Sequence, residues 1–89
     1  MSIVHTVAVV TKGKPTHDRE RLAEMLRKLR TDAGMRQVDL AAKLGEPQSY
    51  VSRFESGEQR LDLLELRAVC SAFGISLSNF VERFEREAS

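Results

Sequence analysis

Hydrophobic and polar positions alternate along most of this chain with the spacing of amphipathic α-helices. In the first such stretch, four apolar side chains recur every three or four positions and charged residues fill most of the positions between them: Leu22, Leu26, Leu29 and Ala33. This spacing places apolar side chains along one side of a helix. Thr16 or Asp18 is a suitable N-cap, and Gly34 is a suitable stop. We therefore predict a first helix from about residue 16 to Ala33.

Two short helices are predicted next, separated by about three residues that include a glycine and a proline. The first covers residues 37 to 44 and ends at Gly45. The second covers residues 48 to about 55 and stops before Gly57, and Pro47 suits its first turn because its missing N–H would be unpaired there in any case. Apolar side chains of both helices are expected to pack together: Leu40, Ala41 and Leu44 from the first, Val51 and Phe54 from the second.

Two more helices complete the pattern. Asp62 and Glu65 have the spacing of a capping box, and Leu61 can contact Leu66 across the start of the helix. The expected inner face of this fourth helix, which Gly74 closes, comprises Leu63, Leu66, Val69, Cys70 and Phe73. A fifth helix follows a cap at Ser76, with Leu77, Phe80, Val81 and Phe84 at helical spacing. Five short helices with tight connections predict a compact all-α domain over residues 16–87.

The N-terminal residues 1–15 differ from the rest. Residues 3–11, IVHTVAVVT, are rich in β-branched side chains and are followed by Gly13 and Pro15, which fits a short strand or an extended arm. A lone strand leaves its backbone unpaired, so an ordered strand here needs a partner such as its copy in a second subunit or another protein. The alternative is a frayed terminus.

Composition narrows the class of function. A chain of 89 residues with 14 basic and 13 acidic side chains is one small domain, better suited to binding than to catalysis. No catalytic motif, metal-ligand spacing or glycine-rich phosphate loop is present, and His5 and His17 belong to no such pattern. We therefore expect neither a cofactor nor a metal. Cys70 alone cannot form an internal disulfide, and the chain has neither a signal peptide nor a long apolar span, so we expect a cytoplasmic protein without a membrane partner.

The third helix carries the candidate chemistry. Four polar side chains lie opposite its apolar side: Gln48, Ser49, Ser52 and Arg53. Arg can bind guanine with two hydrogen bonds, Gln can bind adenine in the same way, and Ser can bind either base. Each of them alone would ordinarily be a solvated surface residue. Their grouping on the second of two helices joined by a glycine-containing turn instead predicts a helix-turn-helix that reads base edges, at about residues 37–55.

The order and spacing of residues in this region resemble those of the Cro/CI-type, or Xre-type, helix-turn-helix family over about residues 19–84. The matching features are Gln37, Leu40-Ala41, Gly45, Val51-Ser52-Arg53-Phe54-Glu55 and Gly57. The resemblance implies a five-helix lambda-repressor-like domain whose third helix enters the major groove of DNA. It also implies DNA-backbone contacts from Gln37, Tyr50, Ser56, Arg60 and Arg36, and a structural pair between Arg30 and Glu55.

Two features depart from that family pattern. Pro47 removes a backbone N–H near the expected phosphate path, and Glu46 and Glu58 bring negative charge there. Across residues 36–60, four basic side chains are balanced by four acidic ones, so few phosphates should be neutralised per subunit. Specific binding would then need two subunits on half-sites about 34 Å apart.

We accordingly expect a homodimer on a palindromic operator. Its interface is predicted at Phe80 and Phe84, extended by Val7 and Val9 if the N-terminal strand pairs across the two-fold axis. Lys12 and Lys14 are predicted to contact the DNA backbone. The expected function is a transcriptional regulator of repressor or controller type, without a small-molecule effector. The alternative is an antitoxin that represses its own operon and covers a toxin protein with another surface.

Overall fold

The computed structural model describes residues 15–88, and this range folds into five α-helices without a β-strand. In chain order they are α2 (Pro15–Asp32), α3 (Gln37–Leu44), α4 (Gln48–Glu55), α5 (Leu63–Phe73) and α6 (Leu77–Ala88). The prediction of an all-α, five-helix domain is confirmed. The predictions for Val7, Val9, Lys12 and Lys14 lie outside the described residues.

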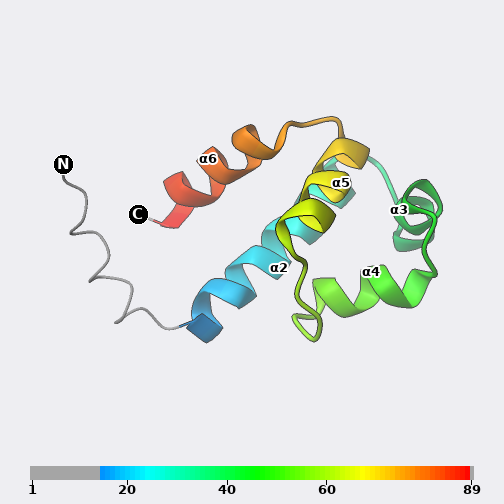
Figure 1. Ribbon diagram of the computed structural model, residues 1–89, viewed down its shortest axis with the longest axis horizontal. Helices are drawn as coiled ribbons and strands as arrows, with labels where there is room; N and C mark the ends of the chain where they lie inside the picture. Colours follow the sequence, from blue (N-terminus) through cyan, green and yellow to red (C-terminus); the bar gives the residue numbers. More distant parts are fainter. Residues whose placement is uncertain (1–14, 89) are drawn as a thin grey trace.

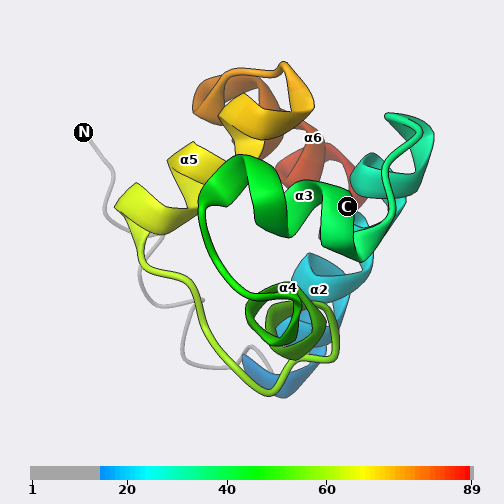
Figure 2. The same cartoon turned by 90° about the vertical axis from the view of Figure 1, so that its right-hand side faces the viewer.

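The long helix α2 crosses the middle of the domain, with α4 and α6 on opposite sides of it (Figure 1). Helices α3 and α4 lie together at one end of the molecule (Figures 1 and 2). In chain order, α5 follows α4 and precedes α6. Because α4 contacts α2 as well as α3, the predicted DNA-reading helix has a rigid support on its inner side.

The ends of the helices follow the local sequence. Gly45 ends α3 with φ 68°, a left-handed conformation that costs glycine little, and its backbone N–H bonds to carbonyls of the last turn. The predicted capping box of α5 is present: Glu65 N donates to Asp62 Oδ1 at 2.8 Å, and Asp62 N donates to Glu65 Oε1 at 2.8 Å. The predicted cap of α6 is present as well, since Asn79 N donates to Ser76 Oγ at 3.0 Å.

One hydrophobic core receives side chains from all five helices. Its buried members are Met25, Leu26 and Leu29 of α2, Leu40 and Ala41 of α3, Val51 and Phe54 of α4, Val69 and Cys70 of α5, and Phe80 of α6. The predicted packing of α3 against α4 is therefore confirmed. Burying such side chains stabilises a small domain by about 1.5–3 kcal/mol each, before the opposing loss of conformational entropy.

Three predicted positions are wrong. Ala33 is exposed, because α2 ends at Asp32 and the chain has turned away. Leu63 was expected inside but is 64% exposed, because it is the first residue of α5 and the described chain leaves it uncovered. Phe80 was expected in a dimer interface but is only 1% exposed, because it fills the core of a single subunit.

Candidate nucleic-acid interface

Helix α4 is attached to the domain by one side only. Val51, Phe54 and Glu55 are its buried residues, and they face α2 and α3. Pro47 adopts φ −73° and ψ 158° as the residue before the helix, so it does not lie in the first turn as expected, whereas α4 covers the predicted residues 48–55. Because the side chain of proline has no hydrogen-bond acceptor, Pro47 caps none of the backbone N–H groups in the first turn of α4.

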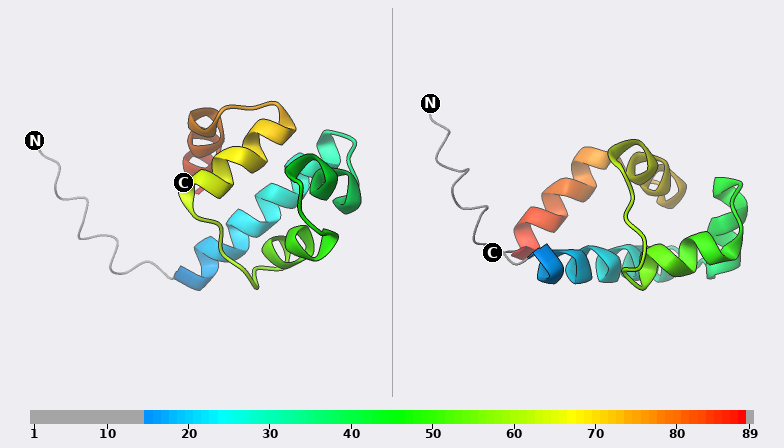
Figure 3. Two further views of the ribbon diagram at one scale, coloured as in Figure 1. Left: turned by 45° about the vertical axis from the view of Figure 1, so that its right-hand side comes forward. Right: turned by 60° about the horizontal axis from the view of Figure 1, so that its bottom comes forward.

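The polar face of α4, formed by Gln48, Ser49, Ser52 and Arg53, is exposed throughout. The helix lies at the margin of the domain, and no other described helix lies outside it (Figures 1 and 3). The four residues predicted to read bases are therefore brought together on one accessible side of one helix.

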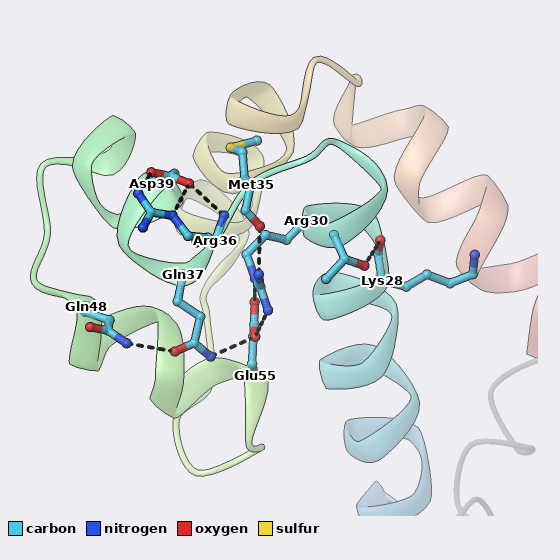
Figure 4. A network of polar contacts seen from close by, with 9 residues as sticks. Lys28, Arg30, Met35, Arg36, Gln37, Asp39, Gln48 and Glu55 are labelled. Atoms are coloured by element: carbon cyan, nitrogen blue, oxygen red, sulfur yellow. Dashed lines mark hydrogen bonds and ion pairs between the residues drawn. The ribbon is translucent and has the colours of Figure 1, made fainter.

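A buried ion pair fixes the inner side of the same helix. Arg30 of α2 meets Glu55 of α4 with two parallel hydrogen bonds, from Nε to Oε2 at 2.6 Å and from Nη2 to Oε1 at 3.0 Å (Figure 4). The two side chains are 10% and 3% exposed. The hydrogen bond with Glu55 raises the pKa of Arg30, although burial acts in the opposite direction. Arg30 Nη1 also donates to the carbonyl oxygen of Met35 at 2.8 Å, which ties the loop before α3 to this pair.

Gln37 connects that buried pair to the exposed polar face. Its Nε2 donates to Glu55 Oε1 at 3.0 Å, and its Oε1 accepts a hydrogen bond from Gln48 Nε2 at 3.1 Å (Figure 4). Gln48 is thereby held with its side-chain oxygen and its second N–H still available. Sequence reasoning missed both bonds of Gln37. The available signal was the position of the two glutamines, each at the first residue of its helix.

Two predicted backbone-contact residues are already engaged in local hydrogen bonds. Arg36 Nη2 lies 3.0 Å from Asp39 Oδ1, and this hydrogen bond, with that of the Arg36 backbone, lowers the pKa of Asp39. Ser56 Oγ donates to the carbonyl of Arg53 at 3.0 Å and closes the end of α4. Arg36, Ser56 and Arg60 are all exposed and lie next to α3 or α4.

Tyr50 does not share the polar face of α4. It is half-buried, and its ring meets that of Phe54 edge-on with centroids 5.6 Å apart. Burial raises the pKa of Tyr50, and the nearby carboxylates of Glu65, Glu46 and Asp62 raise it further. These negative charges oppose a phosphate contact at this position.

Residues 15–88 hold no group of three or more His, Cys, Asp or Glu side chains arranged to bind a metal ion. Cys70 is buried in the core, and burial raises the pKa of its thiol to about 11. In the same range no single helix is long and apolar enough to cross a membrane; α5 and α6 reach that length and composition only when counted as one segment, and the pair is bent by 97°.

Comparison with known proteins gives a consistent result. The helix-turn-helix family model matches residues 26–80. An XRE-family like protein from Pseudomonas syringae pv. tomato str. DC3000 is 30% identical, with a TM-score of 0.75 over 94% of this chain and 98% of that one. The clp gene regulator ClgR from C. glutamicum is 29% identical, with a TM-score of 0.69 over 76% of this chain and 87% of that one.

A third structure shares the fold at lower identity. It is the restriction-modification controller protein C.Esp1396I, a tetramer in complex with its natural 35 base-pair operator, at 24% identity and a TM-score of 0.69 over 84% of this chain and 96% of that one. No curated protein sequence gave a significant match. The matched helices include the whole turn between α3 and α4 and the polar face described above. The chain therefore belongs to the Xre, or Cro/CI, type of the helix-turn-helix family and is a DNA-binding regulator.

Proposed function

We propose that this protein regulates transcription by binding a specific double-stranded operator through the major groove. The observation that carries the proposal is the polar face of α4, where four exposed hydrogen-bonding side chains stand on a helix whose other side is fixed by the core and the Arg30–Glu55 pair. A rigid helix of this kind places side chains accurately enough to distinguish base pairs.

Each residue of the polar face has a role that fits its chemistry. Arg53 is exposed and has no ion pair in residues 15–88. Two N–H groups of its guanidinium are therefore available to donate to guanine O6 and N7. Gln48 retains an acceptor and a donor after its bond to Gln37, the combination that recognises adenine N7 and N6. Ser49 and Ser52 supply shorter donors or acceptors on the same side.

The DNA backbone would be held on either side of this face. Gln37 has one amide N–H left for a phosphate at the start of α3, where the helix dipole favours negative charge. Arg36, Ser56 and Arg60 are the further proposed backbone contacts, whereas the carboxylates around Tyr50 argue against that residue. The proposal for Lys12 and Lys14 rests on their charge in the sequence alone.

We further propose a homodimer that binds a palindromic operator, which places the protein in the cytoplasm with its DNA. Two half-sites about one helical turn apart are the geometry that a pair of such domains requires. The concentration of the protein itself would set how much dimer is available to bind.

Selection of binding sites from random duplexes tests this function, since it reports half-site sequence, spacing and symmetry together. Arg53→Ala should relax the preference at one base step at a cost of about 1–3 kcal/mol. Gln37→Ala should weaken binding to all duplexes and also relax the base read by Gln48, which loses its partner. Arg27→Ala, which removes the same charge from the outer side of α2, serves as the control and should change neither. An equal loss on every duplex for Arg53→Ala would refute the assignment of base reading to α4.

A further inference from the structure

A hollow of about 150 Å³ lies between α2 and the segment that joins α4 to α5 (Figures 1 and 3). Its apolar lining combines three buried side chains with two half-buried ones: Ala23, Leu26 and Phe54, then Leu22 and Leu61. In another protein, an engineered cavity of about 150 Å³ lined by Leu, Ile and Phe binds benzene. The hollow therefore has the size and the apolar lining to hold one small ring.

The polar side chains of the same hollow favour a negatively charged group. Arg19 and Arg60 line it and no carboxylate does, while Gln59 adds a half-buried side-chain amide. Within residues 15–88 neither arginine has an ion pair, and the Gln59 side chain has no hydrogen bond. Guanidinium groups bind carboxylates with strong, charge-assisted hydrogen bonds. A ligand that fits both parts of the lining has an apolar ring and a carboxylate.

Two other hollows in the described part of the chain lack this charge. One, of about 220 Å³, has two basic and two acidic side chains, and its Arg21 is paired with Asp18 at 2.8 Å and lies over the ring of Phe84. The other, of about 270 Å³, has Asp18 beside Arg19. A carboxylate would meet an acidic side chain in either of them, so the hollow next to α4 is the one that suits it.

We propose that this hollow binds a small aromatic carboxylate of about the size of benzoate. The ring lies on Leu26 and Phe54, and the carboxylate lies between Arg19 and Arg60, with an N–H of Gln59 as a further donor. The proposal replaces the expectation from sequence that no small molecule acts on the protein. Periodicity and motifs missed the site because its residues come from two separate stretches, 19–26 and 54–61, which meet only in the folded chain.

Occupation of the hollow would oppose DNA binding. Arg60 is one of the proposed backbone contacts, and the N–H groups that bind the ligand carboxylate cannot bind a phosphate at the same time. Phe54 at the base of the hollow belongs to the inner side of α4, so the ligand also contacts the helix that reads bases. The binding site stands on its own geometry, whereas its effect on DNA rests on the proposed function. Coupling of this kind is reciprocal, so DNA should weaken binding of the ligand by the same factor.

The first experiment titrates sodium benzoate into the ¹⁵N-labelled full chain without DNA and follows the backbone amide signals by NMR. For a ligand this small we expect a dissociation constant of about 0.1–1 mM. The largest shifts should occur at Ala23, Phe54 and Leu61. Benzamide keeps the ring and lacks the charge, so it should bind about 10-fold more weakly.

Variants separate the two parts of the lining. Arg19→Gln removes one charge and should raise the dissociation constant of benzoate by about 10-fold. Arg67→Gln makes the same change on α5, outside the hollow, at another exposed arginine without an ion pair in residues 15–88, and should leave the constant within about twofold. Ala23→Leu fills the hollow and should abolish binding of benzoate and benzamide alike. If a thermal melt shows that Ala23→Leu unfolds, the exposed pair of arginine variants still decides the outcome.

A second experiment measures the effect on DNA. With benzoate tenfold above its dissociation constant and the ionic strength held constant with chloride, affinity for the selected operator should fall by about fivefold or more. Arg67→Gln should show the same fall, and Arg19→Gln a smaller one.

Four results would overturn the proposal. They are the absence of a saturable shift with benzoate, equal binding of benzamide and benzoate, an equal loss in Arg67→Gln and Arg19→Gln, and nuclear Overhauser contacts of Leu22 with residues 3–11 in the free protein. The last would mean that the chain's own N-terminal segment fills the hollow. A protein that binds benzoate as expected but selects no duplex would contradict only the proposed function. One that selects a duplex and binds no benzoate would contradict only this inference.

Discussion

Removal of the carboxylate of Glu55 is the sharpest test of how the DNA-reading helix is supported. In Glu55→Ala, the guanidinium of Arg30 keeps its position, with a side chain only 10% exposed, but loses both hydrogen bonds to its partner. Gln37 loses the acceptor of its Nε2 at the same time. The variant therefore contains a buried positive charge without a counter-charge and an amide that no longer holds Gln48.

The cost follows from that buried charge. Breaking a buried ion pair by removing one partner costs about 3–5 kcal/mol, because the remaining charge stays desolvated. The whole free energy of unfolding of a small domain is about 5–15 kcal/mol. For a domain of this size each kcal/mol moves the melting temperature by about 4–8 °C, so the midpoint should fall by at least about 12 °C.

The measurement is a thermal melt followed by circular dichroism at 222 nm, with urea unfolding at 25 °C as a second measure of the free energy of unfolding. The matched control replaces both partners, Arg30→Met with Glu55→Met, which removes the unpaired charge and should recover a large part of the loss. An unchanged midpoint in Glu55→Ala would refute the reasoning. A double variant less stable than Glu55→Ala would show that the packing, not the buried charge, sets the cost.

The remaining predictions concern the core and the helix ends. Because burial raises the pKa of Cys70 to about 11, its thiol should resist Ellman's reagent at pH 8 until the protein unfolds, and rapid labelling of the native protein would contradict this. An unfolded thiol titrates near 9.0, so the stability gained by keeping Cys70 protonated is complete below that pH and is lost as the pH rises toward 11, which urea midpoints across this range will report. Asp62→Ala removes one bond of the capping box and should lower the free energy of unfolding by about 1 kcal/mol, whereas Ser71→Ala on the outer side of the same helix should leave it nearly unchanged. Gly45→Ala forces a side chain into φ 68° and should cost about 1–2 kcal/mol in the same urea assay, although nothing lies within 4 Å of the added atom.

The residues that cap the helix ends explain why much of the helix pattern was predictable. The bounds of α3 agree with the prediction because Gly45 is the residue that takes the left-handed conformation at its end. The capping residues of α5 and α6 could also be predicted, since each makes its hydrogen bond to a residue three positions away in the sequence. The bounds of α4 also agree with the predicted 48–55, but Pro47 precedes the first turn instead of lying in it, because its φ is compatible with a helix while its ψ of 158° is extended.

Periodicity was less informative about what covers each helix. It identified an apolar side of α5 that included Leu63, but it could not show that the neighbouring side chains end before the first turn. It placed Phe80 and Phe84 on one side of α6 without separating the residue inside the core from the residue under Arg21. The pair of Arg30 and Glu55 was expected only from resemblance to a family, because 25 positions separate the two residues.

The structure also changes the charge balance that the sequence indicates for the DNA-facing region. Residues 36–60 sum to zero, but Glu55 is neutralised by Arg30 from outside the segment, and Asp39 is paired with Arg36. The uncommitted side chains are then three basic and two acidic: Lys43, Arg53, Arg60, Glu46 and Glu58. A duplex would meet a weakly positive surface that neutralises few phosphates, so nonspecific affinity would be low. Base contacts from one subunit are then insufficient for tight binding, and the second subunit of the proposed homodimer would supply the remaining contacts by bringing another polar face to the same duplex.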